Sequence, residues 1–179
     1  MEILGCIFII AFGSLGHFLF EWCGHRKAAG LFFAVNESTW EHIKLSIYPA
    51  FIWMIVEVAV RGFSENLVVA QAASMATMML LIPGLFYGYT AITKKNWLIP
   101  DIMCFCVAVA IGMWVFHAIM DAAPVSVVLY VISIIWLVAV LVMYFRFSYN
   151  PPHNFLFRDP ISGGFGPKGH DCHSHFHTH

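Results

Sequence analysis

Histidine and carboxylate side chains in this sequence recur at a spacing that brings them onto one face of a helix. His17, Glu21 and His25 stand four residues apart, and His117 and Asp121 have the same separation. Since an α-helix turns once in about 3.6 residues, the members of each set project from one side. Imidazole and carboxylate together suit zinc, iron, manganese, cobalt or nickel. Both sets are therefore candidate metal ligands.

A denser polar cluster occupies residues 35–44, with the sequence VNESTWEHIK. Ser38 and Glu41 have the S-x-x-E spacing of a capping box, which predicts a helix that begins here, with Glu41 reaching back to Ser38. Capping leaves Glu37 and His42 unexplained, so both join the candidate metal ligands. If the protein is an enzyme, Glu37 or Glu41 is the candidate general base.

Several of these positions also have a purely structural explanation. Glu21 can pair with one of the basic residues that follow it, and His17 can bond to a neighbouring helix. His117 and Asp121 can simply cap the end of a helix. The sequence leaves these alternatives open.

The last eleven residues, GHDCHSHFHTH, hold five histidines with one cysteine and one aspartate. Alternating imidazoles on a flexible segment are typical of a low-specificity site for divalent metals. The candidate ligands here are His173, His175 and His177. An affinity tag is the alternative explanation, although tags are usually unbroken histidine runs.

The elements that position these residues must be membrane helices. The chain has 179 residues, of which 60% are hydrophobic and 11% charged, and its mean hydropathy is +0.79. Soluble domains carry about 25% charged residues, so the composition excludes a soluble globule. A net charge of −1 excludes a basic nucleic-acid-binding module. What remains is an all-α, polytopic membrane protein.

Five apolar runs are long enough to cross a bilayer, which takes about 20 residues. They extend from Ile3 to Cys23, from about Ser38 to Arg61, from Leu67 to Ile92, from Trp97 to about Met120 and from Val125 to Phe147. We therefore expect one five-helix transmembrane domain at residues 1–148 and a flexible, His-rich tail at residues 149–179.

Basic residues predict the orientation of these helices. Eight of the nine lie in the first or third connection or at its edge, or at or beyond the end of the last run, and Arg61 lies on the other side. The positive-inside rule then places the N-terminus outside and the tail in the cytoplasm. Glu21, His25 and the 35–44 cluster would share the cytoplasmic face of the cell membrane, with His117 near the outer face. The expected partners are the bilayer and a metal ion, with a second copy or another membrane subunit as further candidates.

Two resemblances rest on the same polar stretches. Residues 35–44, with GHFLFEW at residues 16–22 and the His-ended tail, resemble a family of small bacterial integral membrane proteins without an assigned function. Asn36, Glu37, Trp40 and His42 are similar to a pattern that begins a membrane helix in the progestin/adiponectin-receptor, hemolysin-III and alkaline-ceramidase superfamily. That resemblance implies zinc held partly by a Ser-x-x-x-His pair, although those proteins have seven spans.

Three functions fit this sequence. The first is binding of a divalent transition metal, zinc foremost, near the cytoplasmic face for transport or delivery. The second is a membrane-embedded metal-dependent hydrolase of a lipid or other amphiphile, in which His17, Glu21 and His42 hold the metal. The third is a metal-free subunit that handles protons or a small solute. A shared metal site requires His17 and His42 to lie within about 8 Å of each other, given metal–ligand bonds near 2 Å and the reach of the side chains.

Overall fold

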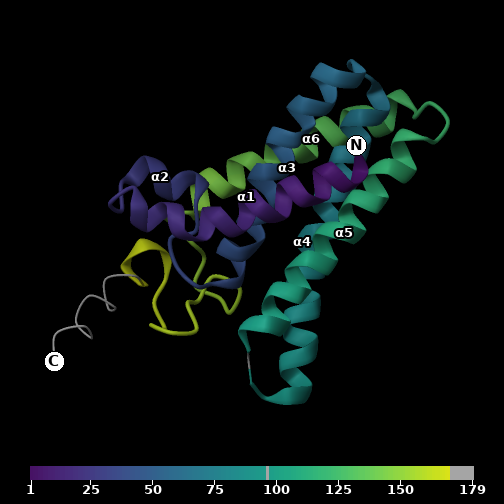
Figure 1. Cartoon of the computed structure of the whole chain (residues 1–179). Helices are drawn as coiled ribbons and strands as arrows, with labels where there is room; N and C mark the ends of the chain where they lie inside the picture. The colour runs from purple at the N-terminus through teal and green to yellow at the C-terminus, as the bar shows by residue number, and fades with distance from the viewer. Residues whose placement is uncertain (96, 170–179) are drawn as a thin grey trace, which may run out of the picture.

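The computed structural model describes residues 1–95 and 97–169, and helices make up most of them (Figure 1). The five long helices are α1 (Glu2–Trp22), α3 (Thr39–Arg61), α4 (Glu65–Thr93), α5 (Leu98–Met120) and α6 (Val127–Phe147). Between α1 and α3 lies a short helix, α2 (Lys27–Phe32), and a 3-10 turn, η1, covers Gly166–Gly169. Within the described ranges, extended pairing is limited to one isolated bridge between Arg158 and Phe165.

All five long helices are long and apolar enough to span a membrane, which confirms the expected all-helical fold with five candidate spans. Their ends lie within about two residues of the predicted bounds. Serine side chains explain where three of them begin. Ser38, Ser64 and Ser126 each accept the backbone N–H of the residue three positions later, at 3.2–3.4 Å.

The capping box at the start of α3 is only half formed. Ser38 is the predicted cap, but its own N–H donates to the Asn36 side chain at 2.9 Å. The Glu41 carboxylate accepts the N–H of Val35 instead, at 3.0 Å. The prediction that Glu41 bonds back to Ser38 is therefore wrong, because Asn36 satisfies that donor first and leaves Glu41 to a buried N–H nearby.

Close helix packing depends on small residues. A Cβ on Gly13 of α1 would lie 2.6 Å from the carbonyl oxygen of Leu45 in α3, and one on Gly112 of α5 would lie 2.7 Å from Met78 in α4.

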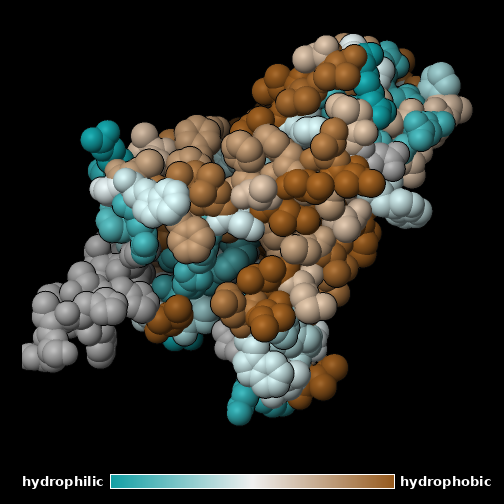
Figure 2. Space-filling model, in the orientation of Figure 1, coloured by the Kyte–Doolittle hydropathy of each residue, from teal (hydrophilic) through white to brown (hydrophobic). Residues whose placement is uncertain are grey.

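The surface of the molecule is apolar over its middle, while hydrophilic atoms gather at its ends and in the hollow beside the end of α4 and the start of α5 (Figure 2). This distribution suits a protein surrounded by a hydrocarbon layer.

The chain after α6 folds back onto the end of the bundle where α1 ends and α3 begins (Figure 1). Phe157 is buried, with its ring centroid 4.7 Å from that of Trp40. The backbone N–H of Trp40 donates to the Leu156 carbonyl. The Asn36 side chain donates to the Gly166 carbonyl at 3.0 Å. Residues 149–167 of the predicted tail thus pack on the bundle, whereas His173, His175 and His177 lie outside the described residues.

Candidate metal centre

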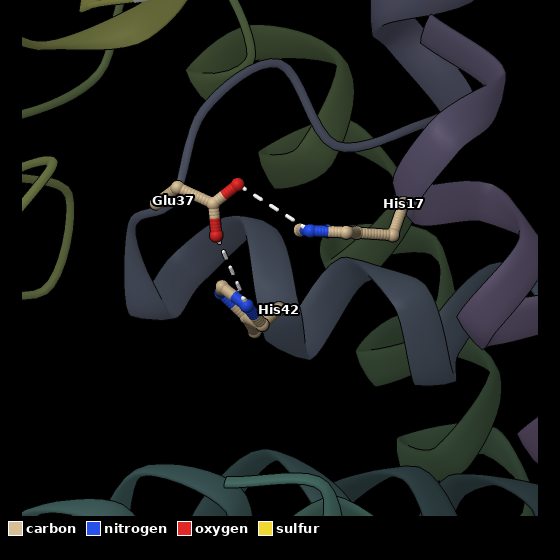
Figure 3. A group of neighbouring side chains, drawn as sticks. All are labelled: His17, Glu37 and His42. Carbon is tan, nitrogen blue, oxygen red and sulfur yellow. Dashed lines mark ion pairs between the residues drawn. The ribbon is translucent and has the colours of Figure 1, made fainter. Parts of the chain in front are cut away.

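Three side chains from three separate elements converge at the end of the bundle where α1 ends and α3 begins. His17 projects from α1, Glu37 from the loop between α2 and α3, and His42 from the first turn of α3 (Figure 3). One Glu37 oxygen lies 3.4 Å from His17 Nε2 and the other lies 3.7 Å from His42 Nε2. All three ligand atoms are within 4.8 Å of one another.

These separations suit a metal ion. Bonds of about 2.1 Å at tetrahedral angles place ligand atoms about 3.4 Å apart. Both carboxylate–imidazole distances, each to a different oxygen of Glu37, are close to this value. Two imidazoles and one carboxylate fill three positions of a tetrahedral site, which leaves a fourth for water or another ligand.

The backbone fixes the orientation of His42. Its Nδ1 lies 3.0 Å from the Ser38 carbonyl oxygen, which can only accept a hydrogen bond, so Nδ1 carries the proton. In a neutral ring this leaves the lone pair on Nε2, the atom that faces Glu37. Two electron-pair donors, His42 Nε2 and a Glu37 oxygen, then face each other at 3.7 Å, an arrangement that a metal ion can bridge. Such a backbone bond is the usual second support of a metal-binding histidine.

The loop that carries Glu37 is anchored on both sides. Asn36 and Ser38 are buried at 5% and 1% exposure, whereas the Glu37 side chain between them is 38% exposed. Asn36 bonds to both the Ser38 N–H and the Gly166 carbonyl. The carboxylate is therefore presented to solvent from a rigid base.

Beneath this loop lies a fully buried ion pair. Lys44 Nζ is 2.5 Å from Glu41 and also donates to the Gly30 carbonyl at 3.0 Å and to Ser148 at 3.2 Å. With the Val35 N–H on Glu41, this network joins α2, the loop, α3 and the end of α6. Its charges are thus satisfied within the protein, as burial in a low-dielectric interior requires.

One further contact, near the surface, also joins the end of α6 to α2. Tyr149, just after α6, donates its phenol proton to the Lys27 carbonyl at the start of α2. Burial, together with the negative charge of Glu41, raises the pKa of Tyr149 above its ordinary value. The phenol therefore stays protonated and remains a donor at neutral pH.

A small pocket of about 90 Å³ adjoins two of the three ligands, His17 and Glu37. His17, Glu37, Asn36 and Glu21 are among the residues that line it. Glu21 lies four residues beyond His17 on the same face of α1, so its carboxylate borders the same space. Among the pocket's lining residues, Glu21 is the one carboxylate besides Glu37.

Only part of the predicted ligand set comes together. Among residues 1–95 and 97–169, His17, Glu37 and His42 are the one group of three with metal-like spacing. His25 is exposed at a left-handed backbone position, with its ring against Phe20. Glu41, the other candidate base, lies in the buried ion pair.

The outer candidates lie elsewhere in the fold. His117 is buried in the last turn of α5, and the exposed Asp121 follows as the residue that ends this helix. The backbone links them, through a hydrogen bond from the Asp121 N–H to the His117 carbonyl at 3.0 Å. They do not form a group of three with any other described ligand.

The supporting residues were not identified from the sequence. In the sequence, Asn36 is part of a motif and Lys44 is one of the basic residues, and neither is predicted to support the site. The sequence does indicate that Lys44 can pair with Glu41, because it follows Glu41 by three residues and falls on the same helical face. Nothing local indicated that the pair is buried or that Asn36 reaches Gly166.

Comparison with known proteins leaves the function open. No curated protein and no solved structure matches the chain. A family model described as a family of unknown function, DUF6512, matches residues 2–167. The chain therefore belongs to the DUF6512 family.

Proposed function

We propose that this membrane protein binds a divalent transition metal, zinc foremost, through His17, Glu37 and His42. The convergence of these three ligand atoms within 4.8 Å carries the proposal. The protonated Nδ1 of His42 adds to it, because Nε2 is then available as a ligand. The zinc chemistry implied by the Ser38 and His42 resemblance points the same way, as an analogy.

The role we favour is transport or delivery of the metal. The three ligand side chains are 32–39% exposed, so an ion can reach them and leave again. A closed structural site would use four protein ligands and shield the metal from solvent. Mixed histidine and carboxylate ligation with one open position fits a site that loads and unloads.

A metal-dependent hydrolase is the second candidate, and the pocket beside Glu21 favours it. In that role the metal would activate a bound water, and a nearby carboxylate would take its proton. Glu41 is held by Lys44, and Glu37 would be a ligand, so Glu21 would act as the base. Metal-free proton handling, with Glu37 between two imidazoles, is the third.

The site is best placed on the cytoplasmic side of a bacterial cell membrane, by the positive-inside rule. Lys44 no longer counts, because it is buried in an ion pair. Six exposed basic residues of the described chain still lie on the expected inner side, against Arg61 on the other: Arg26, Lys27, Lys94, Lys95, Arg146 and Arg158.

Metal content of the full-length protein tests the proposal. The five histidines of residues 170–179 would first be replaced by asparagine, so that only the membrane site is counted. We expect about one equivalent of zinc in the protein purified in detergent, as one site per chain requires. His17→Gln, Glu37→Gln and His42→Gln should each lose most of it, measured by inductively coupled plasma mass spectrometry.

His25→Asn is the matched control, because asparagine tolerates the left-handed backbone at this exposed position. It should keep the zinc. A zinc content in all three site variants equal to that of the parent protein would overturn the proposed ligands. Absence of metal from the parent protein would favour the proton-handling alternative. Zinc uptake by proteoliposomes, lost in His17→Gln, would separate transport from hydrolysis.

A further inference from the structure

A second pocket, of about 440 Å³, opens in the segment that follows α6. It is lined by His153, Asn154, Phe155, Arg158, Gly163 and Phe165, none of which belongs to the candidate metal centre. The segment begins at the end of a membrane helix and packs against the start of α3. The pocket therefore lies at the membrane boundary rather than within the helix bundle.

The walls of this pocket are held in place by local structure. His153 stacks flat on Phe165, with ring centroids 4.4 Å apart and planes 16° from parallel. Asp159 closes the turn beneath them: its N–H donates to the Gly164 carbonyl, and its carboxylate accepts from Ile161 and Ser162, each at 2.8 Å. The pocket is thus a formed feature of the fold.

The charge of Arg158 is left available by this arrangement. Its neighbour Asp159 is buried at 2% exposure and already bonded within the turn. In the described part of the chain, Arg158 donates a hydrogen bond from Nε to the Gly163 carbonyl at 3.4 Å, forms the backbone bridge to Phe165 and makes no ion pair. Within the described residues the two Nη groups are free to donate to a ligand, and a guanidinium fork matches the oxygens of a phosphate.

Apolar side chains flank the charged pocket. Phe155 is 72% exposed and Ile161 is 61% exposed. Phe155 also lies against Tyr87 of α4, with ring centroids 5.5 Å apart, so a membrane-spanning helix borders the pocket. Exposed aromatic and aliphatic residues beside a basic group are typical of a surface that contacts lipid headgroups.

We propose that this pocket binds the phosphate of an anionic phospholipid headgroup. Arg158 donates to the phosphate oxygens, and the His153 ring and Asn154 amide lie beside it in the same pocket. Phe155 and Ile161 contact the adjoining acyl region. The proposal is independent of the metal centre, because the two sites share no lining residue.

Lipid retention by the full-length protein tests this site. The protein, exchanged into neutral detergent, would be titrated with phosphatidylglycerol, phosphatidylcholine or inorganic phosphate and examined by native mass spectrometry. We expect tightest retention of phosphatidylglycerol, weakened about fivefold or more by Arg158→Gln, as expected for one basic group near anionic lipid. Arg158→Lys should restore part of the binding, because it keeps the charge and loses the fork.

Arg146→Gln is the matched control. Arg146 is exposed in the last turn of α6, carries the same charge and does not line the pocket. It should bind as tightly as the parent. Equal losses in both variants would reduce the effect to general surface charge and overturn the site. Phosphate binding as tight as that of phosphatidylglycerol would overturn the lipid as its ligand.

If Arg158→Gln does not fold, His153→Leu gives a second test. Leucine keeps an apolar contact with Phe165 and removes the imidazole from the pocket wall. It should weaken phosphatidylglycerol retention without changing the helical circular dichroism spectrum. Unchanged retention in a folded His153→Leu variant, with an unfolded Arg158→Gln variant, would count against the proposed site.

Discussion

Lys44 shows how far the role of a single residue depends on its surroundings. As a letter in the sequence it is one of the basic residues at the edge of a membrane helix. In the fold it is fully buried, paired with Glu41 and bonded to Gly30 and Ser148. It therefore holds the polar end of the bundle together rather than marking a solvent-exposed surface.

Removing one partner of this pair should destabilise the protein strongly. Lys44→Met leaves the Glu41 carboxylate buried without its cation, and breaking a buried pair in this way costs about 3–5 kcal/mol. We expect a clear fall in melting temperature in detergent, followed by tryptophan fluorescence. Glu41→Gln combined with Lys44→Met should recover part of the loss, because the unpaired charge is removed.

Arg146→Met serves as the control for loss of one positive charge. That side chain is exposed, and such changes usually alter the free energy of unfolding by about 0.5 kcal/mol or less. A Lys44→Met variant as stable as Arg146→Met would contradict the buried pair.

The candidate ligands illustrate what residue spacing can and cannot predict. His17, Glu37 and His42 were all among the ten metal candidates, because each is a suitable ligand in an apolar chain. Helical periodicity grouped His17 with Glu21, since it compares positions within one helix. Selection of Glu37 depends on the path of the loop between α2 and α3, which no periodic pattern describes.

At the scale of elements, the loop of residues 33–38 determines the geometry of the candidate centre. It carries Glu37 between two buried neighbours and is tied to the segment after α6 by the bond from Asn36 to Gly166. The carboxylate of Glu37, the proposed ligand, is thus positioned by a contact 130 residues away in the sequence.

Asn36→Ala should therefore weaken metal binding without removing a ligand. Loss of a supporting group of this kind typically lowers metal affinity about 10–100-fold. Asn36→Asp keeps the acceptor for the Ser38 N–H and loses the donor to Gly166, so we expect an intermediate effect. Zinc affinity measured by competition with a fluorescent chelator distinguishes the three proteins.

The chain offers a matched control for this prediction. Asn66, at the opposite end of the bundle, also binds a turn through both side-chain atoms: it donates to the Ile119 and Ala122 carbonyls and accepts the Val125 N–H. Asn66→Ala should disturb that turn but leave zinc affinity unchanged. An equal loss of affinity in Asn66→Ala and Asn36→Ala would point to general loosening of the fold.

The elements differ in how well the sequence predicts them. The five long helices follow from hydropathy, because about 20 apolar residues in a bilayer must satisfy their backbone bonds internally. The helix α2 and the packed segment 149–167 were not predicted. Short helices are marginal on their own and depend on tertiary contacts, here those of Gly30, Trp40 and Phe157.

At the scale of the whole molecule, the polar groups are distributed unevenly. The candidate metal centre, the Glu41–Lys44 pair and the Arg158 pocket all lie at the end where α1 and α6 finish and α3 begins. The opposite end carries the Glu57–Arg61 pair, in which Glu57 also accepts from Trp53. Which end faces the cytoplasm therefore decides where a metal or lipid would be encountered.

Cysteine labelling can establish this orientation. Cys23 is free and exposed at the end of α1, and Phe63 is exposed in the connection between α3 and α4. In a variant whose other four cysteines are serine, a membrane-impermeant maleimide should label Cys23 in inverted vesicles only. With Cys23 also replaced, Phe63→Cys should be labelled in intact cells only, since Cys23 follows α1 at the end of the bundle where α3 begins and residue 63 follows the other end of α3. Reversed labelling would place the candidate metal centre outside the cell, where a cytoplasmic delivery role could not operate.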